Sequence, residues 1–245
     1  MFKSAKFQTV ILCLFLIVAG CGGGNELPDS SAISGGATNP SSLTENAVKK
    51  QEIGAFEEAI KLLHQALQID PQFVPAYYRK GLVYEEWDQR PEAIQAYKKV
   101  LELETSHAGA RLGLGSVYSK LNRNDLAILE YQQVAALRPN DPELLFKIAL
   151  QYWYIQKLPE AADHYRKVIA INADHMQAHL NLASVYEKMK DWEHAIEEIE
   201  IARTLGKKNK DEQAIAIAER KLHFIKGRMH LTAKDMNRKT QPPFE

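Results

Sequence analysis

The chain has 245 residues, of which 45% are apolar and 25% are charged, and its 31 basic and 31 acidic side chains leave no net charge. This composition excludes an intrinsically disordered chain and is sufficient for a substantial core. Both cysteines, Cys13 and Cys21, lie near the start, which excludes a disulfide framework or a cysteine metal cluster in the rest of the chain.

The first 20 residues have the layout of an export signal. Lys3 and Lys6 precede an apolar run at 10–19, and small residues follow it. A bilayer-spanning helix needs about 20 apolar residues, so this run is too short to be an ordinary membrane span. We therefore predict a signal peptide at 1–20. An uncleaved signal anchor and a plain secretory signal remain alternatives.

The end of this segment resembles the lipobox of bacterial lipoproteins. Val18-Ala19-Gly20-Cys21 has a hydrophobic residue, two small residues and then the cysteine. The resemblance implies that Cys21 carries a diacylglyceryl group and, after cleavage, an acyl chain such as palmitate on its amine. Several acyl chains give stable anchoring where one would be marginal. The expected location is the bacterial cell envelope, and Gly22 in place of aspartate favours the periplasmic face of the outer membrane.

A flexible tether is predicted at 21–42, beginning at the lipidated cysteine. Residues 22–42 contain five Gly, five Ser and two Pro with few apolar side chains. Such a segment cannot bury enough surface to offset the entropy lost on ordering. Its root-mean-square reach is about 25 Å, which would keep the folded part near a membrane.

A 34-residue repeat dominates the chain beyond the tether. Five units with first residues near 40, 74, 108, 142 and 176 tile the chain to residue 209 without an insertion. Positions within a unit are numbered from its first residue below. Position 8 is small in every unit, and position 20 is always alanine, as expected where two helices cross closely (Ala47, Gly81, Gly115, Ala149 and Ala183; Ala59, Ala93, Ala127, Ala161 and Ala195).

Apolar residues recur at helical spacing in two runs per unit, which predicts two amphipathic helices joined by a short turn. Ser42 and Glu45 form a possible capping box at the first helix. Asp141 before Pro142 fits the start of another helix. These signals predict an all-α fold.

The period and the small, alanine and aromatic positions resemble the tetratricopeptide repeat (TPR). The resemblance covers residues 43–209 and implies a solenoid of about five helix-turn-helix units. The signature proline at position 32 is present only at Pro71 and Pro139. A capping helix is predicted at 210–228, because Ile215, Ala218 and Leu222 share one face, and a mobile tail is predicted at 229–245.

Catalytic motifs are scarce, so we expect no enzyme activity, no cofactor and no bound metal. His175 and His179 have the spacing of two ligands on one helix face, but no H-E-x-x-H motif accompanies them. Residues 21–206 carry 19 Lys and Arg against 26 Asp and Glu, which argues against nucleic acid as a partner. The basic C-terminal end is read as a solvated helix and tail, although it could contact anionic lipid.

The resemblance also implies a partner-binding groove, because the first helices of TPR arrays line a concave surface at positions 2, 5, 9, 12 and 13. The alternative is that some of these side chains belong to the core, or that the tether or tail covers them. The residues predicted to line the groove are Tyr78, Leu82, Leu112, Ser116, Ser119, Phe146, Leu150, Trp153, Leu180 and Ser184.

The predicted function is a membrane-anchored scaffold that binds helical or extended segments of protein partners in the bacterial cell envelope. A pilotin-like assembly factor for a pilus or secretin is the nearest alternative. A metal-dependent or hydrolytic envelope enzyme is the rival from another class.

Overall fold

The computed structural model describes residues 39–240, with side chains described as far as residue 229. The predictions for the signal peptide, for the lipid on Cys21 and for the tether before residue 39 lie outside the described residues. So does the end of the predicted tail, residues 241–245.

The described residues form α-helices joined by short turns, and they contain no β-strand. The helices are α1 (Pro40–Glu52), α2 (Phe56–Ile69), α3 (Val74–Glu86), α4 (Arg90–Leu103), α5 (Ala108–Lys120), α6 (Asn124–Ala135), α7 (Pro142–Tyr154), α8 (Leu158–Ile171), α9 (Met176–Met189), α10 (Trp192–Asn209) and α11 (Glu212–Thr240). This is the predicted all-α class.

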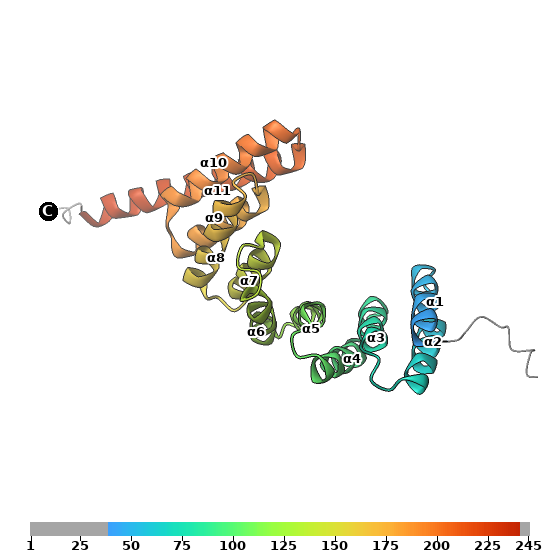
Figure 1. Ribbon diagram of the computed structural model, residues 1–245. Helices are drawn as coiled ribbons and strands as arrows, with labels where there is room; N and C mark the ends of the chain where they lie inside the picture. Colours follow the sequence, from blue (N-terminus) through green and yellow to red (C-terminus); the bar gives the residue numbers. More distant parts are fainter. Residues whose placement is uncertain (1–38, 241–245) are drawn as a thin grey trace, which may run out of the picture. The chain divides into compact units, whose positions relative to one another are not determined.

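The helices are arranged as antiparallel pairs that follow one another along the chain (Figure 1). The first helices of the pairs, α1, α3, α5, α7 and α9, begin at the residues where the 34-residue repeat places the start of each unit. Each first helix packs against its own second helix, and each second helix packs against the next first helix. In the first three units, neighbouring first helices also contact each other.

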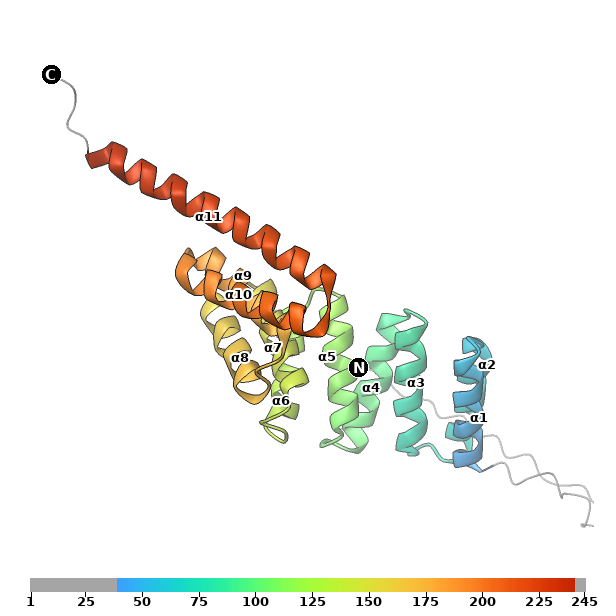
Figure 2. The ribbon, with the colours of Figure 1, turned by 90° about the horizontal axis from the view of Figure 1, so that it is seen from above.

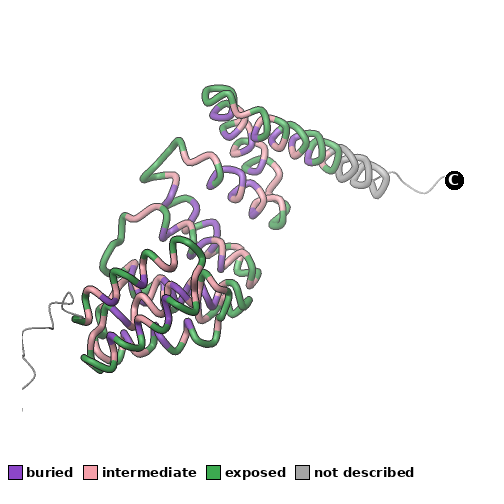
Figure 3. Tube along the Cα trace, turned by 90° about the vertical axis from the view of Figure 1, so that its right-hand side faces the viewer, coloured by how far each residue is buried: buried purple, intermediate pink, exposed green. Residues whose placement is uncertain are grey.

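Small residues at positions 8 and 20 allow the two helices of a unit to cross closely. Every alanine at position 20 is fully buried. Gly81 faces the ring of Tyr97, and an added Cβ atom would lie only 2.4 Å from that ring. The aromatic residue at position 24 therefore fills the space that the small residue leaves. Buried residues recur along the helices of the array (Figure 3) and form separate clusters between neighbouring helices.

A residue with positive φ follows each first helix, at position 15 of every unit. A left-handed residue is a common way to end an α-helix, because it turns the chain and satisfies the last carbonyl groups. Only one of the five is glycine, and the others are polar residues (Gly54, Asp88, Asn122, Gln156 and Lys190). The regular turn in every unit keeps the repeat at constant length.

The first helix begins differently from the prediction. Its N-cap is Asn39, whose side-chain oxygen accepts a hydrogen bond from the backbone N–H of Ser42 at 2.7 Å. Pro40 occupies the first helical turn. Ser42 thus lies inside the helix, and the predicted capping box with Glu45 does not form, because asparagine at 39 already provides the cap.

The last helix is longer than the capping helix predicted at 210–228. α11 runs along α10 and continues beyond it to Thr240 (Figure 2). Residues 229–240, predicted as mobile tail, are thus helical. No proline occurs between Glu212 and Thr240, the single Gly227 does not end the helix, and the next prolines are Pro242 and Pro243. None of the helices in the described range is long and apolar enough to cross a membrane.

Candidate functional site

The predicted groove residues lie on four first helices, α3, α5, α7 and α9, and together form what we call the first-helix surface. All but one are partly exposed. Leu180 is only 4% exposed, so it belongs to the interior and does not line a surface, contrary to the prediction. Leu180, at position 5 of the last unit, therefore packs in the interior instead of contacting a partner.

Two predicted aromatic residues are held by neighbouring histidines. The Tyr78 ring lies 4.7 Å from the ring of His107, and the Phe146 ring lies 5.0 Å from the ring of His175. Both histidines are N-cap residues, and each accepts a hydrogen bond through Nδ1 from the first turn of the following helix. Tyr78 and Phe146 therefore help to fix the start of the next unit.

A carboxylate occupies the first-helix surface between repeats 2 and 3. Glu85 Oε2 accepts a hydrogen bond from the Tyr97 hydroxyl at 3.0 Å, and Glu85 Oε1 accepts one from the Ser116 hydroxyl at 2.6 Å. Lys120 Nζ lies 2.8 Å from the same Oε1 and neutralises its charge. Burial, together with the nearby Glu85 charge, raises the pKa of Tyr97, so its hydroxyl stays a donor. Ser116, predicted to face a ligand, is already bound by the protein.

A small cavity of about 90 Å³ occupies the first-helix surface between repeats 4 and 5. Its lining residues are Leu150, Trp153, Tyr165, Asn181 and Ser184. The Asn181 amide donates a hydrogen bond to the Tyr165 hydroxyl at 3.2 Å. Burial raises the pKa of Tyr165 to about 12, so this hydroxyl is protonated at neutral pH.

Two lysines border this cavity. Lys188 Nζ lies 5.0 Å from the centre of the Trp153 ring and donates a hydrogen bond to the Gln156 side chain at 2.8 Å. Lys221, from α11, donates a hydrogen bond to the Ser184 hydroxyl at 2.8 Å. The α11 helix thus contacts the last helix of the first-helix surface, α9.

The histidine pair considered for metal binding is committed to other contacts. His175 caps α9 through Nδ1. His179 has Nδ1 2.6 Å from a carboxylate oxygen of Glu198 and Nε2 3.0 Å from the carbonyl oxygen of Ala173. Within the described part of the chain, no group of three or more His, Cys, Asp or Glu side chains could hold a metal ion.

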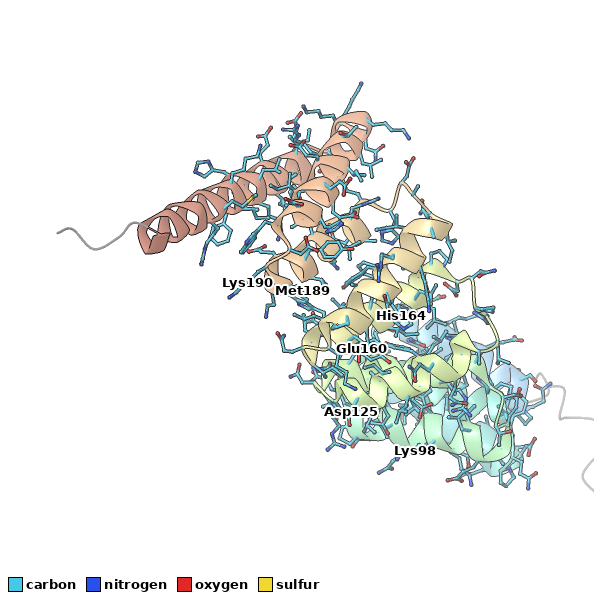
Figure 4. All side chains as sticks on the ribbon, turned by 90° about the vertical axis from the view of Figure 1, so that its left-hand side faces the viewer. Lys98, Asp125, Glu160, His164, Met189 and Lys190 are labelled. Atoms are coloured by element: carbon cyan, nitrogen blue, oxygen red, sulfur yellow. The ribbon has the colours of Figure 1, made fainter. Side chains whose placement is uncertain are left out.

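A larger hollow lies away from the predicted groove. Its volume is about 520 Å³, and Leu145 and His164 are among the residues that line it. His164 and Glu160 both come from α8 (Figure 4). Burial lowers the pKa of His164, which is thus neutral at pH 7. No residue predicted to bind a partner lines this hollow.

Family comparisons decide the nature of the array. A model described as a TPR repeat matches residues 52–86, and models described as tetratricopeptide repeats match residues 88–147 and 146–210. Together they cover most of the helical array. The chain belongs to the tetratricopeptide repeat family.

Solved TPR structures share this fold. A crystal structure of MamA has 26% sequence identity and a TM-score of 0.63, over 67% of this chain and 96% of that chain. MamA from Desulfovibrio magneticus RS-1 has 20% identity and a TM-score of 0.66, over 72% and 99%. YrrB, a TPR protein described as having an unusual peptide-binding site, has 24% identity and a TM-score of 0.63, over 73% and 90%. No curated protein matches the chain.

Sequence reasoning identified part of the TPR surface and missed the rest. Leu150, Trp153 and Ser184 were predicted and line the cavity, whereas Tyr165 and Asn181 were not predicted. Tyr165 lies on the second helix α8, outside the first-helix positions from which the groove was predicted. A signal was present, since Glu85 and Trp153 occupy position 12 in two units that are each followed by a unit with serine at position 9 and lysine at position 13.

Proposed function

We propose that this TPR protein is a scaffold whose first-helix surface, between α7 and α9, holds a segment of a partner protein. The observation that carries the proposal is the cavity lined by Trp153. The next residue in the chain, Tyr154, is a tyrosine that is 54% exposed. Tryptophan and tyrosine are enriched among the few residues that supply most of the binding energy in protein interfaces.

The size of the cavity favours a protein segment over a small molecule. Pockets for drug-sized ligands usually have volumes of about 300–1,000 Å³. The cavity between repeats 4 and 5 has about 90 Å³, which suits one side chain of a segment that lies across the surface. YrrB, which has the same fold, is described as binding a peptide, and this supports the same kind of ligand here.

Anchoring at Cys21 is the second part of the proposal. The lipobox-like residues Val18 to Cys21 and the glycine- and serine-rich segment after them support a lipid-anchored protein of the bacterial cell envelope. Cys21→Ala should abolish lipid attachment and either block processing or release a soluble protein. A variant that stays in the membrane with an unchanged mass would refute this part of the proposal.

Site-specific photocrosslinking in the native envelope tests the binding surface. A photoreactive amino acid in place of Tyr154 should trap a partner, whereas the same amino acid in place of Lys98, an exposed residue of the second helix α4, should not. Equal adducts from both positions would contradict the proposed surface.

Two variants separate binding from folding. Trp153→Ala should weaken the affinity for the trapped partner about thirtyfold, because a hot-spot residue often contributes 2 kcal/mol or more. Tyr154→Lys changes an exposed residue and should weaken the affinity for the same partner with an unchanged melting temperature. If Trp153→Ala only unfolds the protein and Tyr154→Lys has no effect, Trp153 belongs to the core and the proposal is wrong.

A further inference from the structure

We infer that the cavity beside Trp153 binds a carboxylate, the side chain of an aspartate or glutamate in an acidic segment of a partner protein. The inference rests on the proposed function, because it names the chemistry of the segment that the same surface holds.

The contact between repeats 2 and 3 contains an internal template for such a site. There the carboxylate of Glu85, at position 12, receives hydrogen bonds from a tyrosine at position 24 and from a serine at position 9 of the next unit. A lysine at position 13 of that unit completes the arrangement. The chain thus shows which group this set of donors holds.

The same donors recur two units later without the carboxylate. Tyr165, Ser184 and Lys188 occupy the positions of Tyr97, Ser116 and Lys120, whereas Trp153 replaces Glu85. The indole leaves a cavity in this place, with Tyr165 and Ser184 in its lining.

The Tyr165 hydroxyl indicates which kind of group is missing. This residue is only 1% exposed, and its hydroxyl accepts a hydrogen bond from Asn181. No acceptor for the hydroxyl proton occurs among the described residues. A buried donor without an acceptor is costly, whereas a carboxylate in the cavity would satisfy it as Glu85 satisfies Tyr97.

The lysine beside the cavity lacks the partner that its counterpart has. Lys120 is neutralised by Glu85, but Lys188 contacts a neutral amide and an aromatic ring, and no carboxylate of the described residues forms an ion pair with it. The other lysine at the cavity, Lys221, is paired with Glu187 at 3.6 Å. An incoming carboxylate would therefore neutralise Lys188.

The Ser184 hydroxyl now donates to the carbonyl oxygen of Leu180. Rotation of this hydroxyl would direct its proton to a ligand, as Ser116 directs its proton to Glu85. Trp153 and Leu150 supply an apolar wall beside the polar donors. The expected segment therefore carries an apolar side chain next to its aspartate or glutamate.

Binding of two peptide pools to the full chain, purified in detergent, tests the inference. Both pools consist of capped peptides with apolar and neutral flanking residues, and they differ only in a central Glu or Gln. We expect the Glu pool to bind about tenfold more tightly, because hydrogen bonds to a charged group are stronger than those to a neutral one. Lys188→Met and Tyr165→Phe should each reduce this preference to less than about threefold.

Tyr131→Phe is the matched control, because Tyr131 occupies position 24 of the preceding unit and should leave the preference unchanged. Equal binding of both pools would overturn the inference but leave the proposed protein-binding function intact. If both Lys188→Met and Tyr165→Phe keep the preference for the Glu pool, the carboxylate binds elsewhere, and this result would also overturn the inference. Binding of neither pool at millimolar concentration would refute the carboxylate site, while the crosslinking experiment would still decide the proposed function.

Discussion

The contact between repeats 2 and 3 and the contact between repeats 4 and 5 use the same repeat positions with opposite results. In the first, the carboxylate of Glu85 fills the space between the helices and is held by Tyr97, Ser116 and Lys120. In the second, Trp153 stands at the position of Glu85 and a cavity remains. A carboxylate at position 12 thus accompanies the contact that the protein closes itself, and an indole at the same position accompanies the contact that keeps a cavity.

A second set of positions is filled in both contacts but with different chemistry. The side chain at position 4 bonds to the carbonyl oxygen of position 32 in the preceding unit and to a carboxylate at position 23. Arg111 does so with Thr105 and Glu130. His179 does so with Ala173 and Glu198. An arginine keeps its charge at all physiological pH values, whereas a histidine does not.

The largest expected effect comes from exchanging the residues at position 6, which are Gly113 in repeat 3 and Asn181 in repeat 5. Gly113 lies beside Tyr97, and a Cβ atom added to it would lie 2.4 Å from the tyrosine ring. The ring is fully buried and faces Gly81 on the other side, so it cannot move away. Gly113→Asn should lower the free energy of unfolding by about 3 kcal/mol, at the upper end of overpacking effects.

The reverse change, Asn181→Gly, is the control for this exchange. It removes the hydrogen bond to Tyr165 and an exposed one from Gln177, and should cost only about 1 kcal/mol. Urea unfolding measures both values. If both variants lose the same free energy of unfolding, the rings of Tyr97 and Tyr165 have similar surroundings, and the two contacts do not differ as described.

A medium effect is expected when the internal carboxylate is removed. Glu85→Ala leaves the buried Tyr97 hydroxyl without its acceptor and Lys120 without its partner, which should cost about 2 kcal/mol. Glu86→Ala is the matched control, because Glu86 is the adjacent, exposed residue and contacts only the Gln51 side chain among the described hydrogen bonds. Chemical denaturation of both variants checks the difference. A cost for Glu85→Ala no larger than that for Glu86→Ala would mean that Glu85 does not stabilise the filled contact.

The smallest expected effect is a pH dependence confined to repeats 4 and 5. Burial alone would lower the pKa of His179, but the hydrogen bonds with Glu198 and with the Ala173 carbonyl outweigh burial and raise it. Because the folded-state pKa lies above the ordinary value, protonation favours the folded state. This contribution is complete below the unfolded pKa, about 6.5, and is lost as the pH rises through the folded pKa.

His179→Arg tests this, because it installs the residue found at Arg111. The free energy of unfolding of the wild type should fall by about 1 kcal/mol relative to the variant as the pH rises from about 5.5 to 8.5. Other titrating groups, such as His64 and His164, are present in both proteins and cancel in the difference. A difference that stays constant with pH would show that His179 does not titrate with folding.

The fold was largely predictable from the sequence. A constant 34-residue period, with small residues and alanines in register, predicts helix pairs, and the structure has them. The prediction ends the last helix where its apolar face ends, whereas α11 continues past Gly227, and no proline occurs before Pro242. The cap at Asn39 was missed because Ser42 and Glu45 offered a competing motif.

The site was predictable only in part. Periodicity places Leu150 and Trp153 on one helix face, but it does not show that Tyr165 reaches the same place from a second helix. It also cannot show that Ser116 is bound by Glu85 while Ser184 borders a cavity, because both serines occupy position 9. That difference depends on the side chain at position 12 and on the space it fills.

The most direct test of the comparison needs no ligand. Trp153→Glu places a carboxylate where Glu85 stands two units earlier, and Trp153→Gln places a side chain of the same shape without the charge. If the site between repeats 4 and 5 is built for a carboxylate, urea unfolding at pH 7 will show the Glu variant to be about 1 kcal/mol more stable than the Gln variant. The advantage should disappear when both are combined with Tyr165→Phe and Lys188→Met. A Gln variant as stable as the Glu variant, or more stable, would contradict the account.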